Sequence, residues 1–440
     1  MMLLWTLILE TVCVRMDGYI PQPNNKESFN MFQGRVKADV IGGFQTCFLT
    51  EFIVQNKNFL LQIDTGSSDT VLPITGINAY KGPTVDYTVP SSAVISTSTY
   101  GDGSSWKGFG VMLPLTVPNT ILNISVPVGI ATSQSESPQF MDGDPINGLL
   151  GIGFDSLSQF DNFNPKTMMD TWAANKLIRN EVSFHSCPYS SKSKSWIDFG
   201  NDTPFTECGN QSVTISVPYK SYFTLNLIGI EILGKSQPFP TRFQSTSSNT
   251  AGRSWSILDS CTSVILLPSS IQSAFAASIK ASGGFSTSLT SDANFDKFLT
   301  GRVSVKIPSS DIKWSKFPTL GFRITSNIGE VLLVLGPKQY LQYDTAGYLN
   351  FLVVTGDDKY AILGLPIFSA YHITLNRADG TITFRLGCDC SLSTDGYPMI
   401  VGKDVNITTG IVPPNNSVWM STNPNWILIS ISIMASFLLV

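Results

Sequence analysis

The 440 residues are 42% hydrophobic, which is enough to bury the cores of two domains. Only 14% are charged, the formal net charge is −4 and there are no basic runs, so nucleic acid is not an expected partner. The two histidines, His185 and His372, belong to no ligand-spaced cluster, so we expect neither a metal site nor a cofactor. Acid–base chemistry would therefore fall to carboxylates.

The composition predicts a mainly β protein. The 35 glycines and 25 prolines, together with abundant serine and threonine, separate short runs of valine, isoleucine, leucine and phenylalanine. Helical periodicity is rare, and the best helix candidates run from Pro165 to Leu177 and from Pro268 to Ser282. The predicted fold class is all-β with a few short helices.

The chain begins with an apolar segment. Residues 1–15 are expected to be a signal peptide, although Glu10 interrupts the run and a basic start is missing, and a misassigned start is the alternative. Residues 16–35 are predicted to be a linker or a short pro-segment. The two lobes that we expect after it span residues 36–186 and 187–390.

Two loops of similar build each present an acid at the end of an apolar strand. Residues 59–63 run into Asp64-Thr65-Gly66-Ser67, and residues 255–258 run into Asp259-Ser260-Cys261-Thr262. A single Asp-Ser/Thr-Gly sequence arises by chance in roughly one chain in five of this length, but a second, similar loop is harder to dismiss. Because the acids are about one domain apart, we expect each lobe to contribute one carboxylate to a shared site.

Between the two acid loops lies a predicted hairpin. Residues 96–99 lead into Tyr100-Gly101-Asp102-Gly103, a turn signal between two β-rich runs. The turn is either an ordinary hairpin or a tip that closes over a ligand, with Tyr100 as the contact. Further along, residues 147–153 are apolar with regularly placed glycines and are predicted to be a core strand.

Taken in order, these motifs resemble those of the pepsin-like aspartic endopeptidases over residues 40–387. The resemblance implies two β-rich lobes that enclose a cleft, and an extended peptide or protein substrate bound by a monomer. It is carried by the following motifs: Asp64-Thr65-Gly66-Ser67, Tyr100-Gly101-Asp102-Gly103, Gly148-Leu149-Leu150-Gly151, Asp259-Ser260 and Ile362-Leu363-Gly364.

The resemblance also implies a role for each site residue. Asp64 and Asp259 would share one proton, one acting as base on a water and the other as acid on the scissile carbonyl. The neighbouring residues would support these acids, and the hairpin would form a flap over the substrate. The supporting residues would be Thr65, Gly66, Ser67, Ser260, Cys261 and Thr262, and the flap residues Tyr100, Gly101 and Asp102.

Two departures from the family pattern bear on activity. Cys261 stands where a glycine is expected and could crowd the acids. The tryptophan usual after the first acid loop is replaced near Val71, so Tyr100 is expected to lose its hydrogen-bond partner. The favoured function is an aspartic endopeptidase, and the alternative is an inactive surface glycoprotein that binds peptides or proteins.

Cysteines and sequons indicate the secretory route. Six cysteines follow the apolar start, which suggests disulfides, with Cys187 and Cys208 the most plausible pair. Five glycosylation sequons point the same way, at Asn123, Asn201, Asn210, Asn406 and Asn415.

The end of the chain suggests attachment to a membrane. Residues 391–425 are rich in Ser, Thr, Pro and Asn and are predicted to be a stalk. Residues 426–440 are uncharged and, at ~1.5 Å per residue, too short for the ~30 Å bilayer core, which favours a GPI-attachment signal over a short single-pass helix. The expected location is the extracellular face of the plasma membrane or the lumen of an acidic vesicle.

Overall fold

The computed structural model describes eleven segments of the chain. They are residues 36–43, 47–101, 103–135, 139–143, 145–188, 194–200, 211–237, 255–292, 294–326, 329–387 and 396–402. The expected signal peptide, pro-segment, stalk and hydrophobic tail lie outside these residues. Within the described segments, no helix is both long and apolar enough to cross a bilayer.

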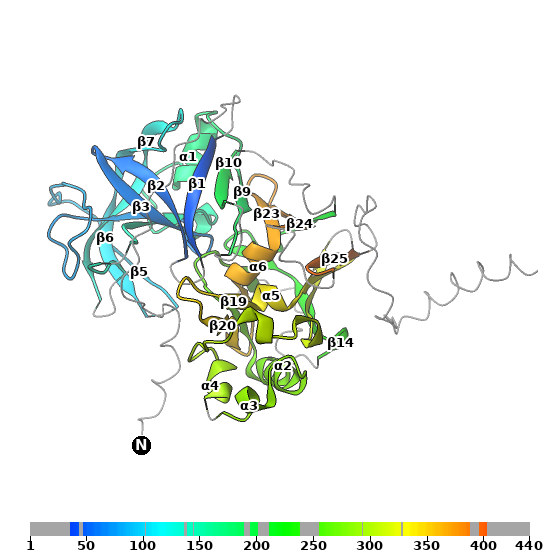
Figure 1. Cartoon of the computed structure of the whole chain (residues 1–440). Helices are drawn as coiled ribbons and strands as arrows, with labels where there is room; N and C mark the ends of the chain where they lie inside the picture. Colours follow the sequence, from blue (N-terminus) through cyan, green and yellow to red (C-terminus); the bar gives the residue numbers. More distant parts are fainter. Residues whose placement is uncertain are drawn as a thin grey trace, which may run out of the picture.

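The first half of the described chain consists mostly of strands (Figure 1). Its elements are β1 (Val36–Gly43), β2 (Cys47–Val54), β3 (Lys57–Asp64), β4 (Thr70–Pro73), β5 (Ser96–Thr99), β6 (Ser105–Thr116), β7 (Asn123–Gln134), β8 (Gly148–Gly151), η1 (Asp155–Leu157), α1 (Met168–Ala174), β9 (Glu181–His185) and β10 (Trp196–Phe199).

The second half adds short helices to the strands. Its strands are β11 (Ser212–Ser216), β12 (Phe223–Leu225), β13 (Leu227–Ile232), β14 (Lys235–Ser236), β15 (Ser256–Leu258), β16 (Ile265–Leu267), β17 (Leu320–Ser326), β18 (Gly329–Leu335), β19 (Leu341–Tyr343), β20 (Leu349–Phe351), β21 (Val353–Thr355), β22 (Ile362–Leu363), β23 (Tyr371–Asn376), β24 (Thr381–Leu386) and β25 (Met399–Gly402). Its helices are α2 (Ser269–Ala281), α3 (Thr287–Thr290), α4 (Phe295–Phe298), η2 (Ser309–Asp311), η3 (Trp314–Lys316), α5 (Pro337–Tyr340) and α6 (Leu365–Ala370). The fold-class prediction is confirmed.

One thirteen-stranded sheet joins the two halves of the chain. Its order is β11-β24-β23-β9-β10-β1-β2-β3-β8-β4-β7-β6-β5, so strands from near both ends of the described chain are hydrogen-bonded into one sheet. The sequence of β24 shows why such a segment forms a strand, because apolar residues alternate with polar ones along it. Ile382, Phe384 and Leu386 are buried, while the residues between them are more exposed. The expected lobe boundary at residue 186 stays a prediction.

Each acid loop leaves a strand that has the same neighbours in both halves. In the first half, β3 pairs parallel with β8, β8 pairs antiparallel with β4, and β4 pairs parallel with β7. In the second half, β15, β22, β16 and β21 repeat this parallel, antiparallel, parallel sequence. This repeated topology places Asp64, at the end of β3, and Asp259, directly after β15, in equivalent positions.

The strands behind the acid loops can pass so closely because they carry glycine. A Cβ on Gly364 would lie 2.1 Å from the carbonyl oxygens of both Thr262 and Val264, and a Cβ on Gly151 would lie 2.5 Å from the Asp69 nitrogen. These separations are far inside van der Waals contact. Glycine at these two positions therefore allows the backbones to approach each other closely behind the acid loops.

The two predicted helices form where the sequence signals place them. α1 lies inside the expected range 165–177, and the Thr167 hydroxyl caps it by accepting a hydrogen bond from the Asp170 N–H. α2 fills the expected range 268–282 and buries Ile271, Phe275 and Ile279.

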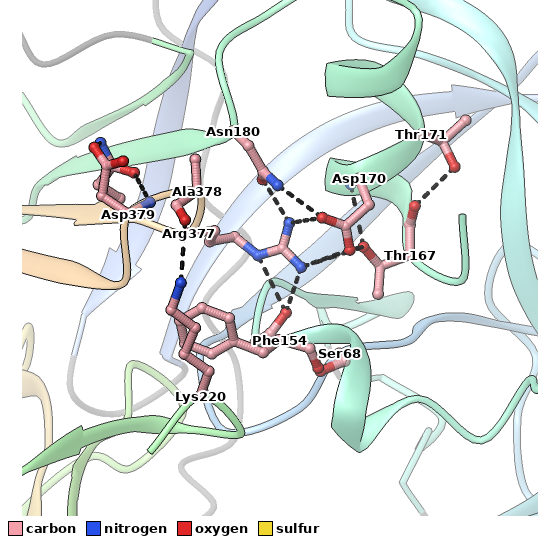
Figure 2. A network of polar contacts seen from close by, with 12 residues as sticks. Ser68, Phe154, Thr167, Asp170, Thr171, Asn180, Lys220, Arg377, Ala378 and Asp379 are labelled. Carbon is pink, nitrogen blue, oxygen red and sulfur yellow. Dashed lines mark hydrogen bonds and ion pairs between the residues drawn. The ribbon is translucent and has the colours of Figure 1, made fainter. Parts of the chain in front are cut away.

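A buried arginine from the second half holds elements of the first half together (Figure 2). Arg377 follows β23, is 4% exposed, and donates to both carboxylate oxygens of Asp170 at 2.8 and 2.9 Å. It also donates to the Asn180 side chain and to the Gly153 carbonyl. Burial alone would raise the pKa of Asp170, but the hydrogen bonds and charge of Arg377 hold that pKa below its ordinary value.

Candidate active site

The two aspartates have equivalent sets of hydrogen-bond donors. The Ser67 hydroxyl donates to Asp64 Oδ2 at 2.5 Å, and the Gly66 N–H donates to Asp64 Oδ1 at 2.7 Å. In the second loop, the Thr262 hydroxyl donates to Asp259 Oδ2 at 2.6 Å, and the Cys261 N–H donates to Asp259 Oδ1 at 2.9 Å. Each carboxylate is thus held by one hydroxyl and one backbone amide from its own loop.

The loops are braced against each other through Thr65 and Ser260. The Thr65 hydroxyl donates to the Leu258 carbonyl at 2.9 Å and accepts from the Ser260 N–H at 2.9 Å. In return, the Ser260 hydroxyl donates to the Ile63 carbonyl at 2.7 Å and accepts from the Thr65 N–H at 3.1 Å. These four bonds fix the separation of the loops, and with it that of the carboxylates.

The carboxyl groups of Asp64 and Asp259 lie within hydrogen-bonding contact of each other. A Cβ on Gly66 would lie 3.1 Å from both carboxyl groups, so this position also favours glycine. Burial raises the pKa of Asp64, and the charge of Asp259 raises it further; burial also raises the pKa of Asp259. Two such groups cannot both ionise readily, so the pair retains a shared proton to higher pH than an isolated aspartate.

Cys261 fits into the second loop without displacing Asp259. Its N–H makes the same bond as that of Gly66, and its carbonyl accepts a bond from the Cys47 thiol at 2.9 Å. Its own thiol contacts that of Cys47, and this contact together with burial raises the pKa of Cys261 well above its usual range. The side chain therefore lies as a protonated thiol beside the pair Asp64 and Asp259, which we call the dyad.

The Tyr100 hydroxyl has a hydrogen-bond partner, contrary to the expectation from sequence. The indole N–H of Trp106 donates to it at 2.9 Å, from the strand β6 that returns from the hairpin tip. Burial and the charge of Asp64 raise the pKa of Tyr100, which places the ring near the first acid. Gly101 has open space around its Cα, as a tip residue should, and Asp102 lies outside the described residues.

Three other side chains around the acid loops were not identified from sequence. Burial and the charges of Asp64 and Asp259 raise the pKa of Tyr222, which shows that its hydroxyl lies near both acids. Asp69, buried a few residues after Asp64, accepts bonds from the Ser158 hydroxyl and the Gln159 N–H, and burial raises its pKa to about 6. The third is Cys47. The positions of Tyr222 and Cys47 beside the acid loops depend on contacts between distant residues, which local patterns do not reveal.

The remaining predicted sites lie away from the dyad or outside the described residues. Asn123 is exposed at the start of β7, whereas Asn201, Asn210, Asn406 and Asn415 are not among the described residues. Cys187 is disulfide-bonded, and because Cys208 is not among the described residues its pairing with Cys208 stays a prediction. Among the described residues, no group of His, Cys, Asp and Glu is arranged to hold a metal ion.

A comparison with protein families agrees with this geometry. The family model described as eukaryotic aspartyl protease matches residues 54–385, which is most of the chain. The matched range begins at the end of β2, includes both acid loops and the hairpin, and ends within β24.

Proposed function

Because the chain belongs to the eukaryotic aspartyl protease family, we propose that it is an endopeptidase whose catalytic groups are Asp64 and Asp259. One observation carries this proposal: both carboxylates contact each other and each accepts one hydroxyl and one amide hydrogen bond. These hydroxyl and amide donors hold the two carboxyl groups in place. The proton that the two groups share remains available for the reaction.

The arrangement suits general acid–base hydrolysis of a peptide bond. The ionised carboxylate accepts a proton from a water as the water oxygen attacks the scissile carbonyl carbon. The protonated partner donates its proton to the carbonyl oxygen, which gives a neutral tetrahedral intermediate. Transfer of a proton to the leaving nitrogen then breaks the C–N bond. The raised pKa values of both acids keep one proton on the pair for this cycle.

The hairpin tip would cover an extended peptide above the dyad. A peptide in this position would bind as an added strand, with backbone hydrogen bonds supplying much of its affinity. The bond from Trp106 holds the Tyr100 ring near Asp64, so the tip has a defined position before the substrate arrives. Tyr222 would contact the substrate from the second half of the chain.

The alternative function, peptide binding without cleavage, was motivated by Cys261. Support for catalysis comes from the second loop, where the N–H of Cys261 and the hydroxyl of Thr262 still hold Asp259. The braces between Thr65 and Ser260 are also complete. Cys261 therefore leaves the hydrogen bonds that position Asp259 in place.

We also propose that the protease works as a monomer in the secretory pathway, attached to a membrane. The apolar start, the five sequons and the uncharged tail support this location. A GPI signal and a short transmembrane helix are the two candidates for attachment. The extracellular face of the plasma membrane and the lumen of an acidic vesicle are the two candidate compartments.

The test is cleavage of a mixed peptide library by the full chain between pH 3 and 7. We expect the wild type to cleave and Asp64→Asn to lose at least ~10³-fold in kcat/KM while remaining folded. Asp296→Asn, the same chemical change at an exposed position, is the matched control and should cleave like the wild type. A folded wild type that binds library peptides without cleaving any would favour the alternative function.

A further inference from the structure

Two cysteines from opposite halves of the chain meet beside the dyad. Cys47 begins β2, and Cys261 lies two residues after Asp259. The Cys47 sulfur lies 2.9 Å from the Cys261 carbonyl oxygen and 3.9 Å from the Ser263 hydroxyl. The two thiols contact each other, and neither sulfur is in a disulfide bond.

The backbone at Cys47 is in a conformation that is uncommon for a residue with a side chain. Its φ is 55°, in the left-handed region, which costs a non-glycine residue free energy and persists only where the surroundings impose it. Cys47 is 1% exposed, whereas Cys261 is only partly buried. Cys261 is therefore the side from which a small reagent would have to approach the pair.

We propose that Cys47 and Cys261 form a reversible disulfide that joins β2 to the second acid loop and switches the active site off. The bond itself follows from the contact between the two residues. The inhibition rests on the proposed function, since it requires that Asp259 be catalytic.

The reaction is a thiol–disulfide exchange with a low-molecular-weight disulfide. The Cys261 thiolate attacks one sulfur of the reagent, forms a mixed disulfide and releases one reagent thiol. The Cys47 thiolate then attacks the Cys261 sulfur and releases the second thiol. The protein loses two protons and two electrons, and the reagent disulfide is reduced to two thiols. A dithiol reverses both steps.

The disulfide would disturb the dyad through the Cys261 backbone. A disulfide brings its sulfurs to about 2.05 Å and its Cβ atoms to about 3.5–4.5 Å, so the contacting side chains must move closer. The Cys261 N–H holds Asp259 Oδ1 at 2.9 Å, and any shift of residue 261 is passed directly to that carboxylate. The bond would also fix the two halves of the molecule to each other next to the substrate position.

The rate of this switch depends on pH. Only thiolates exchange, and the contact with Cys47 together with burial raises the pKa of Cys261, so exchange slows as the pH falls. A redox state set at neutral pH would therefore persist in an acidic compartment.

The test incubates the full-length chain at neutral pH in buffers of reduced and oxidised glutathione. Peptide mapping by mass spectrometry without reduction should show one cross-linked peptide pair containing Cys47 and Cys261. The intact mass of the protein should fall by the mass of two hydrogen atoms, with no glutathione attached to the protein. We expect peptidase activity at acid pH to fall at least 10-fold in this form, and to return after mild reduction that leaves the disulfide of Cys187 intact.

Two variants separate the bond from other effects of oxidation. Cys47→Ser and Cys261→Ser are each compared with their own reduced state, and neither can form the cross-link. Either can gain only a glutathione adduct, which the intact mass reveals. The thermal midpoint should rise on oxidation of the wild type and should not rise in either variant.

The outcomes distinguish this proposal from the proposed function. A wild type that gains glutathione at Cys261 but forms no Cys47–Cys261 cross-link overturns the switch, even if its peptidase activity is normal. A cross-linked wild type with undiminished activity overturns the inhibition. A cross-link that forms in a chain with no activity in either state supports the bond but contradicts the endopeptidase function.

Discussion

The Trp106 indole N–H and the Tyr100 hydroxyl form a 2.9 Å hydrogen bond within a single hairpin. The donor lies on β6, opposite Ser98 of β5, so the register of the hairpin itself positions the indole beneath the tyrosine. The flap is thus steadied from its own returning strand and does not depend on a residue near the first acid loop.

We predict that Trp106→Phe lowers kcat/KM by roughly 5- to 10-fold. The substitution keeps an aromatic ring in the buried position but removes the donor, and a hydrogen bond of this kind contributes about 1 kcal/mol. Trp172→Phe is the matched control, because Trp172 is equally buried but packs in α1 against Phe52 and Phe199. Steady-state kinetics would contradict the prediction if both variants lost activity to the same extent.

We predict that Gly364→Ala destabilises the protein severely. The added methyl would lie 2.1 Å from two carbonyl oxygens of the second acid loop, so the loop or β22 must move, and a loss of more than ~3 kcal/mol is expected. Gly229→Ala is the control, because its nearest new contact is an ordinary 3.6 Å. Urea unfolding of both variants is the measurement, and similar midpoints would refute the expectation.

We predict that Arg377→Lys lowers the free energy of unfolding by about 3–5 kcal/mol. Lysine keeps the charge but cannot reach Asp170, Asn180 and the Gly153 carbonyl together, so buried acceptors lose their donors. Lys280→Ala removes an exposed ion pair with Asp296 and should cost less than about 1 kcal/mol. Chemical denaturation would disprove this if the two variants were equally stable.

We predict that His185 contributes a loss of stability as the pH falls from 6.5 to 4, opposite in sign to the contributions of Asp64 and Asp69, whose raised pKa values favour the folded state in this window. Burial, and then the charge of Lys37, lower the pKa of this imidazole to about 4, so it stays neutral in the fold where the unfolded chain binds a proton. At His185, unfolding therefore takes up a proton in this pH window. Lowering the pH from 6.5 to 4 makes this histidine favour unfolding by roughly 3 kcal/mol.

His185→Phe checks the origin of this pH dependence. His185 stacks on Trp196 with ring centroids 5.2 Å apart, and phenylalanine preserves a stacked ring without a titrating nitrogen. Urea unfolding at pH 7, 6, 5 and 4 should show that the variant gains stability relative to the wild type as the pH falls. Parallel curves for the variant and the wild type would assign the acid sensitivity to other groups.

The features that the sequence predicted are those that depend on nearby residues. The acid loops were found because an apolar run ends in Asp64 and another ends in Asp259, and α2 was found because a proline and a glycine pair bound it. The two-lobed arrangement was predicted from the resemblance to the family, and the all-β fold class was predicted from composition and turn signals.

The features that were missed depend on contacts between distant residues. Cys47 meets Cys261 across 214 residues, and Arg377 meets Asp170 across 207, so neither pairing leaves a local signal. Trp106 differs, because it is six residues from Tyr100. Counting along the predicted hairpin would place it opposite Ser98 and identify it as a candidate partner.

The order of the elements along the chain also determines when a nascent chain can assemble the Asp64–Asp259 pair. β22, which pairs with the strand before Asp259, and β23, which pairs with β9, are among the last described elements to be synthesised. Such non-local pairings form only after the intervening chain is complete. During synthesis, Asp64 therefore leaves the ribosome long before its partner can be held in place. A chain of this topology therefore has no assembled acid pair, and cannot act as the proposed endopeptidase, until nearly all of it has been made.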